Sequence, residues 1–219
     1  PEVAFANARD PEDPELIRAP VADRHSGLAG GGIAYRPLDG GAWRELPTTL
    51  AGGELRATVD STSEPPGRYL FRAGASDAIG NAITTTRRAD GGEMVLTFPL
   101  REPTGIEASI EGNDHATVDY GRTPSIEGTL RGTASGPLPA QAVEVVETFA
   151  PGSSLEPVGR TVATDSRGRF SLELSRGPSR SVSLSYAGTR RYQASRPAAV
   201  ELKVRGSATL VTVRKRVRA

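Results

Sequence analysis

The stretch Gly67–Thr86, which reads GRYLFRAGASDAIGNAITTT, decides the fold class of this chain. Its first half alternates, so that Tyr69, Phe71 and Ala73 point to one face of a strand, and the other face carries Arg68, Leu70 and Arg72. Asp77 then opens a turn of residues that tolerate positive φ, and a β-branched segment follows it. The stretch therefore predicts a β-hairpin with one buried face.

Glycine and proline are spread along the whole chain and divide it into short segments. The 219 residues contain 25 glycines and 17 prolines. Apart from the final stretch, no segment free of both is longer than Ala140–Ala150, whose valines alternate as in a strand. An average helix has about 11–12 residues. Helices are therefore nearly excluded, and an all-β chain of short strands is predicted.

Composition excludes several classes of function. The formal net charge is +1, so the chain as a whole is not attracted to nucleic acid or to a membrane surface. The absence of cysteine excludes disulfides, thiolate metal sites and a cysteine nucleophile. No apolar run reaches the roughly 18 residues of a membrane span, and no signal peptide is recognisable. Because the chain starts at Pro1 without a methionine, we expect it to be a piece of a longer protein.

Alternating segments between turn residues predict a first set of strands. The segments are 1–5, 16–22, 32–36, 42–46, 54–59, 67–73, 82–86 and 94–98. Within this set, Gly67-Arg-Tyr69-Leu-Phe71 resembles the tyrosine-corner strand of immunoglobulin-like sandwiches, in which the hydroxyl reaches upstream backbone. Trp43 would then be the buried tryptophan of that family. Ala75–Asn81 resembles the closing hairpin of bacterial immunoglobulin-like modules of exported proteins. The resemblance implies an immunoglobulin-like β-sandwich over residues 1–103.

A second set of strands follows the predicted linker Pro99–Thr104. The segments are 106–110, 117–120, 125–130, 143–149, 159–164, 168–174, 181–186 and 198–204. Asp165 and Gly168 are predicted to form the tight turn of a hairpin over Thr164–Phe170. This turn resembles one in carboxypeptidase-regulatory-like and transthyretin-like sandwiches, which are usually noncatalytic. Tyr120–Leu130 is similar to the sequence of the second strand in repeat modules of large actinobacterial surface proteins. We expect a second antiparallel sandwich over residues 104–205.

The tail, residues 206–219, alternates like the start of the second module. We interpret it as the first strand of a truncated third module; a frayed basic terminus is the alternative. Its cations, Arg214, Lys215, Arg216 and Arg218, alternate with valines, which favours a half-buried strand over a nucleic-acid contact.

Two histidines raise the question of catalysis. Asp23-Arg-His25-Ser26 contains the residue types of a catalytic triad, and His115 follows Asp114. Neighbours within one turn rarely achieve triad geometry, which is normally assembled from distant segments. We predict solvated turns, no catalytic residue and no enzyme activity.

Acidic and aromatic residues suggest two kinds of binding site. The calcium candidates are Asp10, Glu12, Asp13, Glu15, Asp60, Asp77, and Glu111 with Asn113 and Asp114. Their spacing does not match a known calcium loop, so no metal or cofactor residue is predicted, although calcium at the module junction stays open. The candidate sugar platforms are Trp43, Tyr35 and Tyr192, against core packing. A lysine–asparagine crosslink would need a core lysine, and Lys203 is the one available in the second module.

These observations predict a noncatalytic spacer, adhesion or scaffold segment of a larger exported or cell-surface protein. Its partners would be neighbouring modules of the same polypeptide, with a surface protein or glycan as a further possibility. Nucleic acid binding and direct membrane insertion are not expected. The alternative is an accessory carbohydrate-binding segment of a secreted hydrolase.

Overall fold

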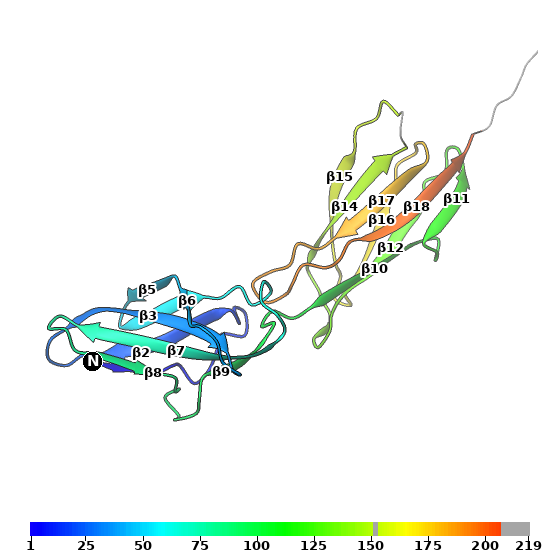
Figure 1. Ribbon diagram of the computed structural model, residues 1–219. Coiled ribbons are helices and arrows are strands. Elements are labelled where there is room, and N and C mark those ends of the chain that lie inside the picture. Colours follow the sequence, from blue (N-terminus) through cyan, green and yellow to red (C-terminus); the bar gives the residue numbers. More distant parts are fainter. Residues whose placement is uncertain (151–152, 207–219) are drawn as a thin grey trace, which may run out of the picture. The chain divides into compact units, whose positions relative to one another are not determined.

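The computed structural model describes residues 1–150 and 153–206, and the regular structure in these ranges is all β-strand (Figure 1). The chain divides into two compact units. Unit 1 contains Pro1–Glu102 and Thr189–Gln193; unit 2 contains Pro103–Gly188 and, among the described residues, Ala194–Gly206. No helix of membrane-spanning length and apolarity occurs in the described chain. The predicted strand of a third module falls on residues outside the described ranges.

The first sheet of unit 1 has the order β1-β2-β6-β5. Its strands are β1 (Glu2–Val3), β2 (Leu16–Ala22), β6 (Glu54–Thr58) and β5 (Thr48–Ala51). Every second residue of β2 and β6 is buried, as the alternating sequence predicts. The short strand β5 was not predicted, because Thr48–Ala51 contains no alternation that distinguishes it from a loop.

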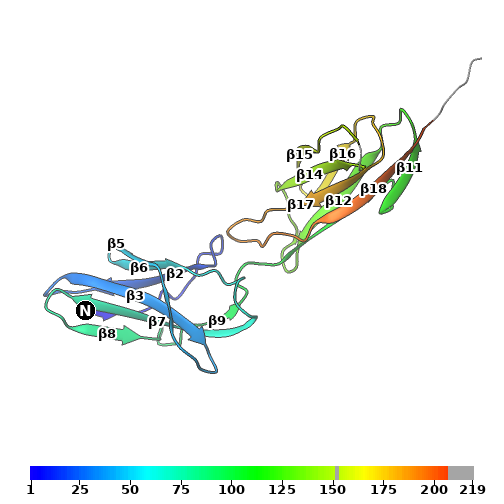
Figure 2. The same cartoon turned by 45° about the horizontal axis from the view of Figure 1, so that its top comes forward.

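The second sheet of unit 1 is built around β7 (Figure 2). It contains β4 (Arg44–Leu46), β3 (Leu28–Pro37), β7 (Gly67–Asp77), β8 (Ala82–Thr85) and β9 (Val95–Phe98). The predicted β7–β8 hairpin is confirmed. Both β8 and β9 pair with β7, one along each half of it. Residues 86–94 connect these two strands, and the Met94 carbonyl accepts the Phe71 N–H of β7 at 2.9 Å.

An aromatic cluster fills one end of the core of unit 1. The ring of Tyr69 stacks on Phe98 with centroids 4.2 Å apart, and Tyr35 stacks on Phe71 at 5.7 Å. The Tyr69 hydroxyl donates a hydrogen bond to the Pro65 carbonyl at 2.9 Å, as expected for a tyrosine corner. The expectation for Trp43 is wrong: its side chain is partly exposed, and Tyr and Phe rings fill the core in its place.

Unit 2 consists of a sheet with the order β10-β12-β16 and a five-stranded sheet with the order β11-β18-β17-β14-β15. The first contains β10 (Thr104–Ile110), β12 (Ser125–Gly132) and β16 (Arg169–Glu173), with β13 (Gly136–Pro137) also paired to β12. The second contains β11 (His115–Asp119), β18 (Ala198–Arg205), β17 (Arg180–Ser185), β14 (Ala142–Phe149) and β15 (Val158–Ala163). Alternate residues of β14 and β17 are buried, which places the core between the two sheets.

Two features of unit 2 differ from the sequence prediction. The turn containing Asp165 and Gly168 does not close a hairpin, because β15 pairs with β14 while β16 pairs with β12 in the other sheet. The turn therefore carries the chain from one sheet to the other. In addition, β11 and β18 run parallel, an exception within the predicted antiparallel sandwich.

Candidate functional site

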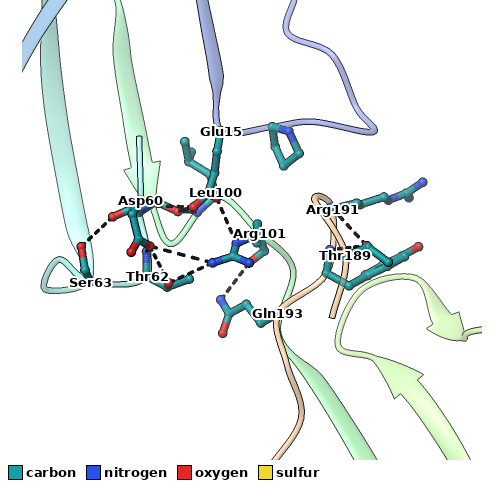
Figure 3. Close-up of polar contacts among 12 residues, drawn as sticks. Glu15, Asp60, Thr62, Ser63, Leu100, Arg101, Thr189, Arg191 and Gln193 are labelled. Atoms are coloured by element: carbon teal, nitrogen blue, oxygen red, sulfur yellow. Dashed lines mark hydrogen bonds and ion pairs between the residues drawn. The ribbon is translucent and has the colours of Figure 1, made fainter. Parts of the chain in front are cut away.

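A polar cluster whose centre is buried lies where the chain leaves unit 1 (Figure 3). We call it the exit cluster; it consists of Glu15, Asp60, Ser61, Thr62 and Arg101. Glu15 directly precedes β2, the residues 60–62 follow β6, and Arg101 follows β9. The cluster therefore joins the exit segment to one end of the antiparallel β2–β6 pair, where β2 begins and β6 ends.

Glu15 is the acceptor at the centre of the exit cluster. The residue is 7% exposed, and its carboxylate accepts hydrogen bonds from the Ser61 backbone N–H at 2.8 Å and from the Ser61 hydroxyl at 2.6 Å. The Ser61 Oγ in turn accepts a hydrogen bond from the Leu100 N–H at 2.8 Å. The same serine thus connects the start of β2 to the segment after β9.

Arg101 completes the exit cluster by pairing with its two carboxylates. Its Nε lies 3.0 Å from Glu15 Oε2, an ion pair rather than an aligned hydrogen bond. Its Nη2 donates to the Thr62 hydroxyl at 3.1 Å and lies 3.8 Å from Asp60 Oδ1. Nothing in the sequence around Arg101 marks it as a partner of Glu15, because an arginine close to two prolines has the composition of a linker.

Hydrogen bonds lower the pKa of Asp60. The Thr62 hydroxyl contributes most, followed by backbone N–H groups; partial burial acts in the opposite direction. Glu15 and Asp60, two of the calcium candidates, thus accept hydrogen bonds from hydroxyl and N–H groups and lie beside the Arg101 guanidinium.

The other acidic candidates of unit 1 are divided among separate contacts. Glu12 pairs with Arg191 at 2.7 Å and Asp13 with Arg190 at 3.1 Å. Asp10 accepts the Glu12 N–H at 2.9 Å. Among residues 1–150 and 153–206, no group of three or more His, Asp and Glu side chains is arranged to hold a metal ion.

The Asp23–Ser26 turn does not form a triad with His25. Asp23 Oδ1 accepts the backbone N–H groups of His25 and Ser26 at 3.0 and 2.6 Å. The Ser26 hydroxyl lies 2.7 Å from Asp77 Oδ2 and 3.2 Å from Asp23 Oδ1. The serine is therefore bonded to two carboxylates that fix two neighbouring turns, and its hydroxyl is not presented to a general base.

The second histidine lies on the surface of unit 2. His115 Nδ1 is 2.6 Å from the carboxylate of its neighbour Asp114, and both side chains are largely exposed. Glu111 adopts a positive φ of 51° in the same turn, and its carbonyl accepts the Asn113 side-chain N–H at 3.1 Å. These candidates form a turn between β10 and β11.

None of the three candidate sugar platforms presents a bare ring. The Arg36 and Arg72 guanidinium groups lie over Trp43, with Cζ 4.7 and 4.5 Å from the ring centroid. Tyr35 belongs to the core and donates to Glu64 Oε1 at 2.8 Å. The third candidate, Tyr192, is half-buried under the Arg191 guanidinium.

Lys203, the residue considered for a crosslink, is exposed on β18 and does not belong to the core.

Unit 2 contains a buried ion pair that the sequence did not reveal. Glu147 and Arg180 are 2% and 3% exposed, and Arg180 Nε lies 2.6 Å from Glu147 Oε2. The Arg180 Nη atoms donate to the carbonyls of Pro178 and Ser175 at 2.9 and 2.6 Å. Arg160 approaches the other oxygen of Glu147 at 3.1 Å. The alternation of β14 shows that Glu147 faces inward, but not which cation pairs with it.

A cleft of about 730 Å³ lies beside β10, β12 and β16 of unit 2. Its lining includes Glu107, Glu127, Gly128 and Phe170, together with Asp165 at the crossing turn. The Asp165 carboxylate accepts the N–H groups of residues 167 and 169, and these bonds lower its pKa, the bond from residue 169 most. This carboxylate therefore shapes the turn.

The paired sheets of the two units define the class of protein, tandem β-sandwiches, and unit 1 has the tyrosine corner found in immunoglobulin-like domains. Comparison with protein-family models finds no match, and comparison with curated proteins finds none either.

Solved structures with similarity to the chain include the following three. One is a tetra-tandem repeat from the extending region of a large adhesion protein, at 17% identity and a TM-score of 0.36, covering 92% of this chain and 48% of that one. A structure concerning host cell surface retention of a 1.5-MDa bacterial ice-binding adhesin has 12% identity and a TM-score of 0.37, covering 90% and 60%. Chicken CNTN1 domains FN1–FN3 have 14% identity and a TM-score of 0.29, covering 92% and 65%. The chain thus spans between about half and two thirds of their lengths, and such low scores carry no functional information.

Proposed function

We propose that this chain is a noncatalytic structural segment of a larger exported or cell-surface protein, serving as a spacer and as an adhesion or scaffold module. The observation that supports this function is the succession of two β-sandwich units, each with its own buried core. Its partners are the neighbouring modules of the same polypeptide, and a surface protein or glycan is a further partner.

The use of polar side chains supports the same function. In the exit cluster and in the Asp23 and Asp165 turns, carboxylates accept N–H, hydroxyl or guanidinium donors from the chain itself. Such bonds stabilise turns and the ends of strands. The resemblance of residues 104–205 to regulatory-like sandwiches and the strand of a third module after Gly206 remain predictions.

An exchange experiment tests the proposed function. In the full-length protein, residues 1–206 are deleted, or are replaced by an unrelated pair of β-sandwiches of equal length. A spacer predicts that deletion impairs surface adhesion while the replacement restores it. Failure of the replacement would show that this chain carries a specific binding site, and an intracellular location of the full-length protein would contradict the proposal.

The alternative function, carbohydrate binding, has a separate test. Trp43 would be the platform, and a glycan array would compare the wild type with Trp43→Ala. We expect no binding that depends on Trp43, because guanidinium groups already lie over its ring.

A further inference from the structure

We propose that the exit cluster is a mechanical lock that determines how much tension unit 1 withstands when it is pulled through its C-terminal exit. The inference rests on the proposed spacer function, in which a segment within a longer chain transmits force. The residues that carry it are Glu15, Ser61 and Arg101.

The exit strand itself is held by few backbone pairs. β9 pairs with only four residues of β7, from Val95 opposite Leu70 to Phe98 opposite Gly67. Beyond Phe98 the chain is held by the Leu100 N–H on Ser61 and by the Arg101 ion pair with Glu15. The Arg101 carbonyl also accepts the Gln193 side-chain N–H at 2.8 Å, and Glu102 exchanges backbone hydrogen bonds with Arg191 and Gln193. Force applied beyond residue 102 therefore reaches the exit cluster before it reaches the β7–β9 ladder.

The exit cluster also links the two sheets of unit 1. β9 belongs to the second sheet, whereas Glu15 and Ser61 flank β2 and β6 of the first sheet. The Glu15 carbonyl accepts the Val59 N–H at 3.1 Å, which fixes Glu15 to the end of β6. Tension on Arg101 is therefore shared between both sheets, and the strand cannot be peeled away alone.

Separation of the ion pair has a high energetic cost because Glu15 is buried. A buried carboxylate that loses its cationic partner is left uncompensated in a poorly solvated place, which is strongly unfavourable. The pair thus resists the first movement of the exit segment. Glu15→Gln removes the charge but retains an oxygen that can accept the Ser61 hydrogen bonds.

Force spectroscopy in two pulling directions tests the lock. The chain has no native cysteine, so introduced cysteines provide unique attachment points. In the first direction the full chain is pulled between Ala78→Cys at the exposed β7–β8 turn and Gly105→Cys, where a side chain meets open space. In the second it is pulled between Ala78→Cys and Ala42→Cys, so that force bypasses residues 99–102.

We expect Glu15→Gln to raise the unfolding rate at constant force on the order of tenfold in the first direction, and to change it much less in the second. The matched control is Glu45→Gln, which removes an exposed ion pair with Arg72 and should leave the first direction unchanged. Equal effects in both directions, or none in the first, would overturn the lock. Arg101→Lys, which keeps the cation but loses the guanidinium contacts, should give a smaller effect of the same direction dependence if Glu15→Gln does not fold. These outcomes do not depend on cellular location or adhesion, so the lock and the proposed function can fail separately.

Discussion

At Tyr69 a single hydroxyl connects the start of β7 to the backbone four residues upstream. Tyr69→Phe removes the donor to the Pro65 carbonyl and keeps the ring that stacks on Phe98. We expect the free energy of unfolding of unit 1 to fall by about 0.5–1.5 kcal/mol, because a partly buried hydrogen bond is lost while the exposed Pro65 can be solvated. Denaturant titration measures the change. An unchanged midpoint would show that the Tyr69 hydrogen bond does not stabilise unit 1.

Asp77 makes the stability of unit 1 depend on pH. Burial raises the pKa of its carboxyl, but hydrogen bonds from Ser26, Asn81 and Ile79 outweigh burial, and the pKa is lowered. A group whose pKa is lower in the folded state stabilises it above its unfolded pKa of about 3.9, and this stabilisation is lost as pH falls through the folded value.

The comparison of wild type with Asp77→Asn tests this dependence. The wild type should be more stable at pH 7, and its advantage should shrink as the pH falls below about 4. Thermal unfolding at a series of pH values gives the difference at each point. A difference that stays constant from pH 7 to pH 3 would exclude Asp77 as the titrating group.

Among the elements, the crossing turn between β15 and β16 depends on Gly168. Its φ is +68°, and a Cβ there would lie 2.7 Å from the Leu130 carbonyl oxygen and 2.9 Å from the Leu138 nitrogen. Gly168→Val should therefore destabilise unit 2 by at least about 1–3 kcal/mol. Gly136→Val is the control, since Gly136 has a similar φ of +73° but open space around it. If both variants lose the same free energy of unfolding, the positive φ alone explains the loss, and the close contacts at residue 168 do not contribute.

The end of strand β14 provides a second test in unit 2. Glu147→Gln breaks the buried ion pair with Arg180 and leaves the guanidinium without its anion. We expect a loss of about 3–5 kcal/mol in the free energy of unfolding. Glu144→Gln on the exposed side of the same strand should have little effect. If both substitutions cost the same, the buried pair is not a major stabilising contact.

Local patterns identify most strands but not their partners. The period of two in β2, β6, β7, β14 and β17 is visible in the sequence, and so is the Tyr69 corner, because both depend on neighbouring residues. The pairs Glu15–Arg101 and Glu147–Arg180 join distant segments, and an arginine-rich chain offers many equivalent cations. For the same reason the alternation around Asp165 predicts a turn but cannot show that its two strands belong to different sheets.

For the whole molecule, the two cores predict separable stability. Tyr69→Phe and Gly168→Val lie in different units and share no core residues, so their effects should add in the double variant. Calorimetry should show that each substitution shifts one transition. A shift of both transitions by either substitution would mean that the chain unfolds as one cooperative body.

The parallel pairing of β11 with β18 also dictates the order in which unit 2 can be completed. β11 leaves a ribosome early, yet its partner is the last described strand of the chain. Until residues 198–205 have emerged, β11 has no strand partner, and the edge of β17 opposite β14 is unpaired. Such long-range pairing forms slowly and leaves strand edges open to other chains. Unit 2 therefore cannot complete its five-stranded sheet until β18 has been synthesised. Truncation before residue 198 should yield a chain that aggregates.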